Sequence, residues 1–235
     1  MQAGGNHIIN QAILDKLKKQ VIVSCQALDN EILHGSDIMA KMAIAAEQGG
    51  AAGIRANGAK DVRAIKEAVD LPIIAIIKAV YPNSDVYITP TIKEVDELAV
   101  LQPAFIAMDC TWRKRPKETL EEVVAHCRMH YPEIMLMADC GSYRDAELAN
   151  NLGFDILGTT LSGYTEETKN VSLPNISLVE QMVANFDRPV FCEGGIHTTD
   201  EMNRAFAAGA HTSVIGGAIT RPNEITQYFV SHIGK

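Results

Sequence analysis

The feature that most constrains the fold of this chain is a regular alternation of short apolar runs with longer amphipathic patterns. The expected strands are 21–25, 51–54, 73–77, 105–108, 135–138, 155–158, 189–192 and 212–216. The expected helices are 37–48, 61–69, 92–100, 120–130, 143–152, 176–185, 200–207 and 225–232. Strands that alternate with helices favour a parallel sheet, and eight such units close into a barrel. The sequence therefore predicts an α/β fold, a single (β/α)8 TIM barrel.

The length and the N-terminal segment refine this prediction. A chain of 235 residues has the usual length of one such barrel. No linker or low-complexity stretch divides it, so we expect one domain over residues 1–235. Ile9, Ile13 and Leu17 recur at four-residue steps, which predicts an additional amphipathic helix ahead of the first strand.

Composition narrows the classes of partner. The formal net charge of −8 argues against nucleic acid, because neutralising phosphates needs a basic face. The basic run 113–115 is interpreted as a solvated loop, with a phosphate or lid contact as the alternative. No apolar run approaches the roughly 18 residues of a membrane helix, so no membrane partner is expected. Five scattered cysteines without a C-x-x-C pair, and an N-terminus unlike a secretory signal, predict reduced thiols in the cytoplasm.

Polar residues follow most of the expected strands. The residues after the eight strands are Gln26, Arg55, Lys78, Asp109, Asp139, Thr159, Glu193 and Gly217, of which six have charged or amide side chains. In a barrel of this kind the active site lies at the carboxyl ends of the strands, so these side chains are expected to converge there. We expect Gln26, Arg55, Asp139 and Thr159 to contact a substrate.

Lys78 is the strongest catalytic candidate. It follows five apolar residues, which places its amine at the mouth of a dry barrel. Burial disfavours the ammonium form, and Arg55 on the neighbouring strand would lower the pKa of the lysine further. A neutral lysine can act as a base or as a Schiff-base nucleophile. The structural alternative is an ion pair with Asp109 or Asp139.

Glu193 is the expected partner of Lys78. It follows the seventh strand, which lies opposite the third in a ring of eight. A carboxyl and an amine that face each other can act on two faces of one carbon, as an epimerase requires. The alternative is a structural salt bridge across the barrel. By strand alternation, Cys140 and Cys192 should point away from the site and serve as packing residues.

Two glycine pairs predict a phosphate site. Gly194 and Gly195 follow the seventh strand, and Gly216 and Gly217 follow the eighth. These loops form the usual phosphate site of such barrels, and Arg221 can add a charged contact. A metal site is not expected, since His126 and His130 lack an adjacent glutamate and a third ligand.

These residues lie in motifs through which the chain resembles the N-acetylmannosamine-6-phosphate 2-epimerase family of sialic-acid catabolism. The motifs are IVSCQAL (22–28), AAEQGGAAGIRANG (45–58), PIIAIIK (72–78), ITPTIKEVDEL (88–98), MADC (137–140), GTTLSGYT (158–165) and GGAITRP (216–222). Three positions differ from the family pattern. Ala79 and Gly195 stand where the family usually has arginine, and Trp112 stands where it often has lysine.

The resemblance implies an activity and residue roles. Lys78 is the implied acid/base and Glu193 its partner, and Gln26, Arg55 and Asp139 are implied to hold the sugar and its acetamido group. Arg221 and the glycine loops are implied to bind the phosphate. Neither a metal nor a nicotinamide cofactor is expected, and we expect a homodimer acting on a small amino-sugar phosphate.

The expected reaction inverts carbon 2 of N-acetylmannosamine 6-phosphate to give N-acetylglucosamine 6-phosphate. Lys78 would remove the proton that the open-chain aldehyde acidifies, and either Glu193 or Lys78 would return it on the other face. Two alternatives are a Schiff-base aldolase using Lys78 and a sugar-phosphate sensor that has lost turnover.

Overall fold

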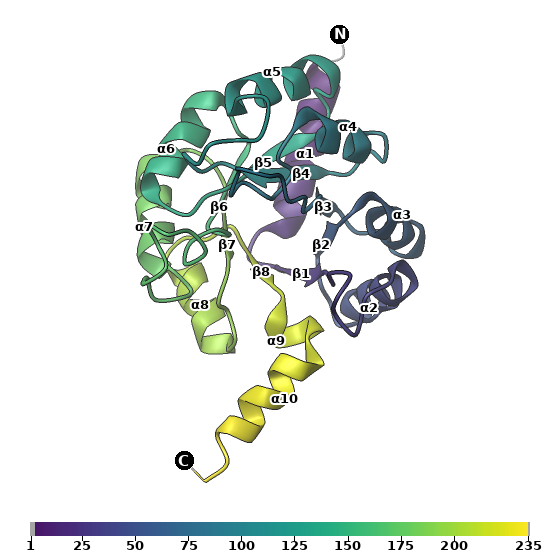
Figure 1. Cartoon of the computed structure of the whole chain (residues 1–235), viewed down its shortest axis with the longest axis vertical. Coiled ribbons are helices and arrows are strands. Elements are labelled where there is room, and N and C mark those ends of the chain that lie inside the picture. Colours follow the sequence, from purple (N-terminus) through teal and green to yellow (C-terminus); the bar gives the residue numbers. More distant parts are fainter. Residues whose placement is uncertain (1–2, 235) are drawn as a thin grey trace.

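The computed structural model describes residues 3–234, with side chains described from residue 10 onward. In this part of the chain, eight parallel strands close into a barrel in sequence order (Figure 1). They are β1 (Val21–Cys25), β2 (Gly53–Asn57), β3 (Ile73–Ile76), β4 (Phe105–Asp109), β5 (Met135–Asp139), β6 (Ile156–Gly158), β7 (Val190–Glu193) and β8 (Thr212–Ile215). Parallel pairing of β1 with β8 completes the ring. The predicted TIM barrel is confirmed.

Helices surround the barrel and follow the strands in turn. They are α2 (Ser36–Gln48), α3 (Ala59–Ala68), α4 (Ile92–Ala99), α5 (Leu120–His130), α6 (Tyr143–Leu152), α7 (Ile176–Asn185) and α8 (Thr199–Ala207). Four of them start at a capping box, in which the cap side chain and the residue three positions later satisfy each other's backbone N–H. The cap residues are Thr91, Thr119, Ser142 and Thr198. Local sequence therefore sets where these helices begin.

The helix predicted ahead of the first strand is present as α1 (Ala3–Leu17), and it lies across the amino-terminal end of the barrel (Figure 1). Leu17 is fully buried among the inward-facing strand residues, which include Ile22 and Phe191, and Ile13 packs against the same cluster. The side chain of Ile9 lies outside the described residues. With this end covered, the cavity of the barrel opens at the carboxyl ends of the strands.

The strand β2 starts two residues later than expected. Gly53 pairs with Ile22, and a side chain at Gly53 would approach Ile22 and Leu17 at 3.2–3.3 Å. This close approach sets the register, and Arg55 then lies inside the strand rather than after it. Because alternate residues face the barrel interior, the Arg55 side chain points inward, where it is 1% exposed.

The chain ends in two helices, α9 (Gly217–Thr220) and α10 (Pro222–Ser231), where one helix was expected. In Figure 1, α10 projects away from the barrel instead of packing against it. None of its residues is buried, and Tyr228, Phe229 and Val230 are at least half exposed. Within residues 3–234, no helix is long and apolar enough to cross a membrane.

Candidate active site

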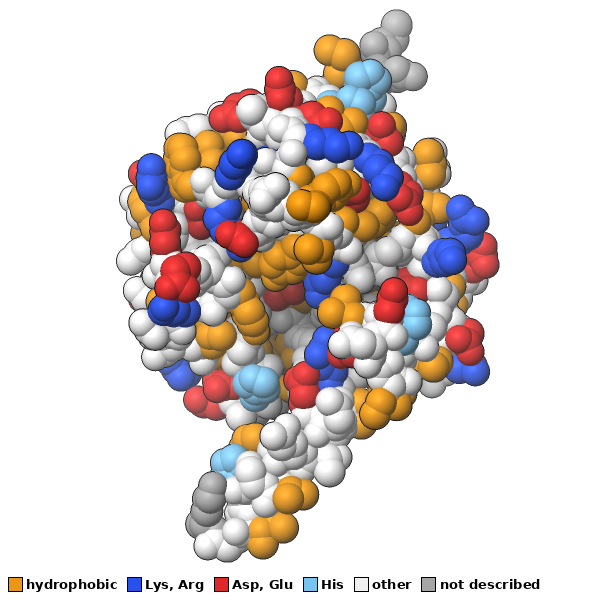
Figure 2. Space-filling model, viewed as in Figure 1, with side chains coloured by type: hydrophobic (Ala, Val, Ile, Leu, Met, Phe, Trp, Pro, Cys, Tyr) orange, Lys and Arg blue, Asp and Glu red, His pale blue; other side chains and the backbone are white. Residues whose placement is uncertain are grey.

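A cavity of about 310 Å³ opens at the carboxyl ends of the strands, in the size range of small-molecule sites. Figure 2 shows the mouth of the barrel hollowed, with charged side chains inside it. Of the residues expected to converge at the strand ends or in the glycine loops, all line this cavity except Asp109, Asp139 and Thr159. The convergence expected from the strand ends is therefore largely present.

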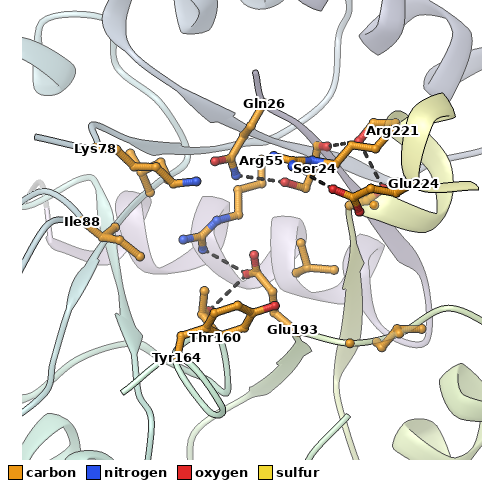
Figure 3. Close-up of a pocket in the computed structure, with 18 of the residues that line it drawn as sticks. Ser24, Gln26, Arg55, Lys78, Ile88, Thr160, Tyr164, Glu193, Arg221 and Glu224 are labelled. Carbon is orange, nitrogen blue, oxygen red and sulfur yellow. Dashed lines mark hydrogen bonds and ion pairs between the residues drawn. The ribbon is translucent and has the colours of Figure 1, made fainter. Parts of the chain in front are cut away.

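Arg55 forms the floor of the cavity, where its guanidinium faces Glu193 (Figure 3), and it pairs with a second carboxylate, Asp139. Its Nη2 lies 2.7 Å from Oδ2 of Asp139, and its Nη1 lies 3.1 Å from Oε2 of Glu193. Burial alone would lower the pKa of Arg55, but the two carboxylates raise it above its usual range. A permanent cation is thus fixed in a dry environment.

Asp139 lies beneath this floor and not on it. Its side chain is fully buried, and both oxygens accept hydrogen bonds from Arg55, at 3.1 and 2.7 Å. Because Asp139 does not line the cavity, its contact with a ligand would run through Arg55. The salt bridge across the barrel, considered for Glu193, is made by Arg55 rather than Lys78.

Thr159 also lies outside the cavity lining, because β6 ends at Gly158 and Thr159 turns into the wall. Its hydroxyl donates to the carbonyl of Glu193 and accepts from the N–H of Glu193, which ties β6 to β7. The next residue, Thr160, lines the cavity. Its Oγ1 lies 2.6 Å from Oδ1 of Asp139 and 3.2 Å from Oε2 of Glu193.

Lys78 stands at the wall of the cavity, directly after β3 and Ile77. Its backbone N–H donates to Oδ1 of Asn57, which fixes the main chain, and the amine points into the cavity toward Arg55 (Figure 3). Among the side chains described, none forms an ion pair with Lys78; Asp139 pairs with Arg55 instead. Burial and the nearby Arg55 lower the pKa of Lys78, while Glu193 opposes the shift. A larger neutral fraction at neutral pH follows.

Glu193 ends β7 on the opposite side of the cavity. Burial raises the pKa of Glu193 to about 7, although the Arg55 guanidinium partly offsets this. A carboxyl group that titrates near neutrality can both hold and release a proton under physiological conditions. Lys78 and Glu193 therefore flank Arg55 as two groups poised for proton transfer.

The glycine loops and Arg221 form the other side of the cavity. Gly195 has φ of +72°, and a Cβ placed there would lie 2.3 Å from Cβ of Leu173. The absence of the arginine usual in the family thus has a local packing reason. Arg221 lies at the rim, 31% exposed, and contacts the carboxylates of Glu31 and Glu224.

Several cavity residues escaped the sequence analysis. Ser24, Tyr164 and Glu224 line the cavity in addition to Thr160. Ser24 could have been found, since it lies two positions before Gln26 and so on the same side of the chain. Nε2 of Gln26 donates to Oγ of Ser24 at 2.9 Å. Oε1 of Gln26 is buried with no hydrogen-bond partner in the described part of the chain, which leaves an acceptor for a ligand.

The basic run 113–115 does not reach the cavity. Arg113 pairs with the carboxylate of Asp109, and Arg115 is buried and donates to the carbonyls of Asp109 and Thr89. Only Lys114 is exposed, so the solvated-loop interpretation holds for one residue of the three. The two arginines stabilise the loop after β4.

The remaining candidates are structural. His126 binds Oδ1 of Asp96, and the described residues contain no cluster of three metal-ligating side chains. All five cysteines are buried. Burial raises the pKa of Cys192 to about 11, which agrees with a packing role and not with a nucleophile.

Comparison with known families gives a consistent result. The family model NanE, described as "Putative N-acetylmannosamine-6-phosphate epimerase", matches residues 39–235. A protein of Enterobacter sp. (strain 638), named "Putative N-acetylmannosamine-6-phosphate 2-epimerase", is 51% identical over 226 residues and covers 95% of this chain and 96% of its own. A protein of the same name from Listeria monocytogenes serotype 4a (strain HCC23) is 47% identical over 230 residues, covering 97% of each chain.

Solved structures agree with this similarity. The structure described as N-acetylmannosamine-6-phosphate 2-epimerase from Clostridium perfringens has a TM-score of 0.90 at 47% identity, covering 93% of this chain and 95% of its own. Thiamine phosphate pyrophosphorylase from Pyrococcus furiosus has a TM-score of 0.59 at 14% identity, covering 92% and 93%. The second similarity reflects the barrel fold alone.

Proposed function

The chain belongs to the N-acetylmannosamine-6-phosphate 2-epimerase family, and from this premise we propose that it inverts carbon 2 of N-acetylmannosamine 6-phosphate through Lys78. The protein is an epimerase, so the question left to its own residues is which groups move the proton. The observation that carries the proposal is the Lys78 amine. It points into the cavity with no ion-pair partner among the described side chains and has a lowered pKa beside Arg55.

In the open-chain sugar, the aldehyde at carbon 1 acidifies the proton on carbon 2. Neutral Lys78 removes this proton, and negative charge develops on the aldehyde oxygen. Among the charged groups near Lys78, Arg55 has the largest effect on the pKa of the amine. Two carboxylates hold Arg55 in place before the substrate arrives. A preorganised donor of this kind stabilises an enolate better than mobile water does.

We propose Glu193 as the second proton-transfer group. It lies across the cavity from Lys78, and its pKa of about 7 lets it carry a proton at neutral pH. Reprotonation by Glu193 on the opposite face would invert carbon 2. In the alternative, Lys78 itself returns the proton after the intermediate rotates, and Glu193 only holds Arg55 and tunes the lysine.

The sugar and phosphate contacts complete the proposal. The unpartnered Oε1 of Gln26 accepts from the acetamido N–H or a sugar hydroxyl. The phosphate binds between the glycine loops of residues 194–195 and 216–217, near the guanidinium of Arg221. Asp139 holds the sugar indirectly by orienting Arg55. The aldehyde and the lysine supply the acidity and the base, so the mechanism requires neither a metal nor a redox cofactor.

We also propose a homodimer. The supporting observation is α10, where Tyr228, Phe229 and Val230 are 50%, 68% and 61% exposed on a helix that packs against little else of the chain. Exposed apolar side chains on a protruding helix favour burial against a second copy. Sedimentation or light scattering of the full chain tests this. A monomer at micromolar concentration would contradict it.

The test of the reaction is proton NMR with N-acetylmannosamine 6-phosphate in deuterium oxide. We expect N-acetylglucosamine 6-phosphate to form with deuterium at carbon 2. Borohydride added during turnover distinguishes a Schiff-base aldolase, because only an imine on Lys78 would be trapped as a covalent adduct. Trapping, or an absence of exchange at carbon 2, would contradict the proposal.

A further inference from the structure

Glu224 is a carboxylate in an unexpected place, because it lines the side of the cavity where the phosphate is proposed to bind (Figure 3). An anion there repels a phosphate and so opposes the binding that the glycine loops and Arg221 favour.

The first contact of Glu224 is with the phosphate arginine itself. Its Oε1 lies 2.9 Å from Nη1 of Arg221. Oε1 of Glu31 lies at the same distance from the same nitrogen. Two carboxylates therefore already neutralise the guanidinium that a substrate phosphate would use.

The second contact is with the glycine loop. A Cβ placed on Gly217 would lie 2.4 Å from Oε2 of Glu224, so the carboxylate rests directly against this glycine. Glu31 differs in this respect, since it does not line the main cavity. Its carboxylate also accepts from the backbone N–H of Leu28, which anchors it in the loop after β1.

From these contacts we propose that Glu224 is an internal competitor of the substrate phosphate. Its carboxylate occupies the Arg221 and Gly217 side of the pocket in the free enzyme, and binding of a phosphorylated sugar displaces it. The inference rests on the proposed function for the position of the phosphate, and adds a residue that sets the affinity and selectivity of that position.

Displacement of Glu224 needs little rearrangement. The Glu224 side chain is 43% exposed, so it can turn into water. It also stands in the first turn of α10, where the helix dipole favours a negative charge in any rotamer. The competing carboxylate weakens the binding of free phosphate and of phosphorylated sugars alike. Only a ligand that also contacts the sugar side of the cavity then binds well, and the phosphorylated product is released more easily.

The experiment compares wild type with Glu224→Gln and with the matched control Glu31→Gln. The glutamine keeps the size of the side chain and removes its charge. We expect Glu224→Gln to lower both the KM for N-acetylmannosamine 6-phosphate and the inhibition constant of inorganic phosphate by about 3- to 20-fold, with kcat changed much less. Glu31→Gln should change both constants by a smaller factor. Binding of unphosphorylated N-acetylmannosamine should be equal in all three proteins.

The opposite results overturn the inference. A higher KM in Glu224→Gln would mean that Glu224 positions Arg221 for the phosphate, and equal effects of both variants would mean that only the net charge near Arg221 matters. Calorimetric titration with inorganic phosphate separates this inference from the proposed reaction, because it needs no turnover. If wild type fails to epimerise and Glu224→Gln still binds phosphate more tightly, the proposed role of Glu224 is supported and the proposed reaction is contradicted. If wild type turns over and Glu224→Gln binds phosphate no more tightly than wild type, the proposed reaction is supported and the proposed role of Glu224 is contradicted.

Discussion

Two arginines of this barrel each pair with two carboxylates but lie in opposite environments. Arg55 at the floor and Arg221 at the rim each contact two carboxylates. The Arg55 side chain is 1% exposed and its partners 0% and 13%, whereas Arg221 is 31% exposed and its partners 26% and 43%. In the buried cluster the loss of one charge leaves another unpaired and poorly solvated, but at the rim water can replace a partner. Burial therefore makes the charge pairs of the floor a fixed part of the cavity, whereas the pairs at the rim can exchange with water or a ligand.

The pKa of Lys78 responds to both clusters. After burial, the groups that shift its pKa are Arg55 and Glu193 from the floor, and Arg221 and Glu31 from the rim. The two arginines lower the pKa and the two carboxylates raise it. Changes in either cluster should therefore reach the base, with the floor acting more strongly.

The largest expected effect comes from removing the base that the two clusters share. Lys78→Ala should reduce turnover by about 10³-fold or more, because general base catalysis contributes up to this order and no neighbouring amine replaces it. The thermal midpoint should change little, since the end of a strand adds little to the core. NMR turnover and a melting curve measure both quantities. Lys114→Ala, on the exposed loop after β4, is the control and should keep wild-type turnover. Substantial activity in Lys78→Ala would show that another group is the base.

The next effect tests whether the floor takes part in proton transfer or only holds Arg55. In Glu193→Gln, deuterium should still enter carbon 2 of the starting sugar through Lys78. Epimer formation should fall by about 10²-fold or more, because an amide has no proton to give. NMR in deuterium oxide follows both processes in one sample. An equal fall in exchange and in epimerisation would contradict proton transfer by Glu193. Glu193 would then only hold Arg55 in place, and Lys78 would transfer the proton on both faces of carbon 2.

A smaller effect is expected at the rim. Arg221→Ala should raise the KM by roughly 10- to 150-fold while kcat changes less, since one charged hydrogen bond to the phosphate is lost. Arg63→Ala is the control, because this arginine lies exposed on α3 and does not line the cavity. Steady-state kinetics of both variants decide the point. An unchanged KM in Arg221→Ala would place the phosphate elsewhere.

The smallest effect concerns the dependence of stability on pH. Burial raises the pKa of Glu193 from 4.5 to about 7, so the folded state binds more protons than the unfolded state between these values. The stability due to protonated Glu193 is complete below about pH 4.5 and is lost as the pH rises through 7. Between pH 4.5 and 7, the free energy of unfolding of wild type should therefore fall relative to that of Glu193→Gln. Urea unfolding at several pH values measures the difference. A constant difference would show that Glu193 stays ionised in the folded protein.

The candidate site shows where prediction from sequence is accurate and where it fails. Lys78 and Glu193 were placed correctly because each follows or ends a short apolar run that can only be a strand. Thr159 was expected to line the cavity, and β6 does end at Gly158 as expected, but the Thr159 hydroxyl bonds the backbone of Glu193 and the next side chain, Thr160, lines the cavity instead. The two-residue error at β2 placed Arg55 at the mouth, when its side chain lies inside the barrel.

The sequence by itself determined the order of strands and helices, the glycine loops and the positions of Lys78 and Glu193. These features depend on periodicity, helix caps and chain breaks, which act over a few neighbouring residues. The tertiary structure alone decided which charges meet. Arg55 contacts Asp139, which lies 84 positions away in the chain, and Glu224 of α10 lies against Gly217 at the cavity. Such contacts depend on strand register and on closure of the ring, and these are set by the packing of the whole barrel rather than by any local run of residues.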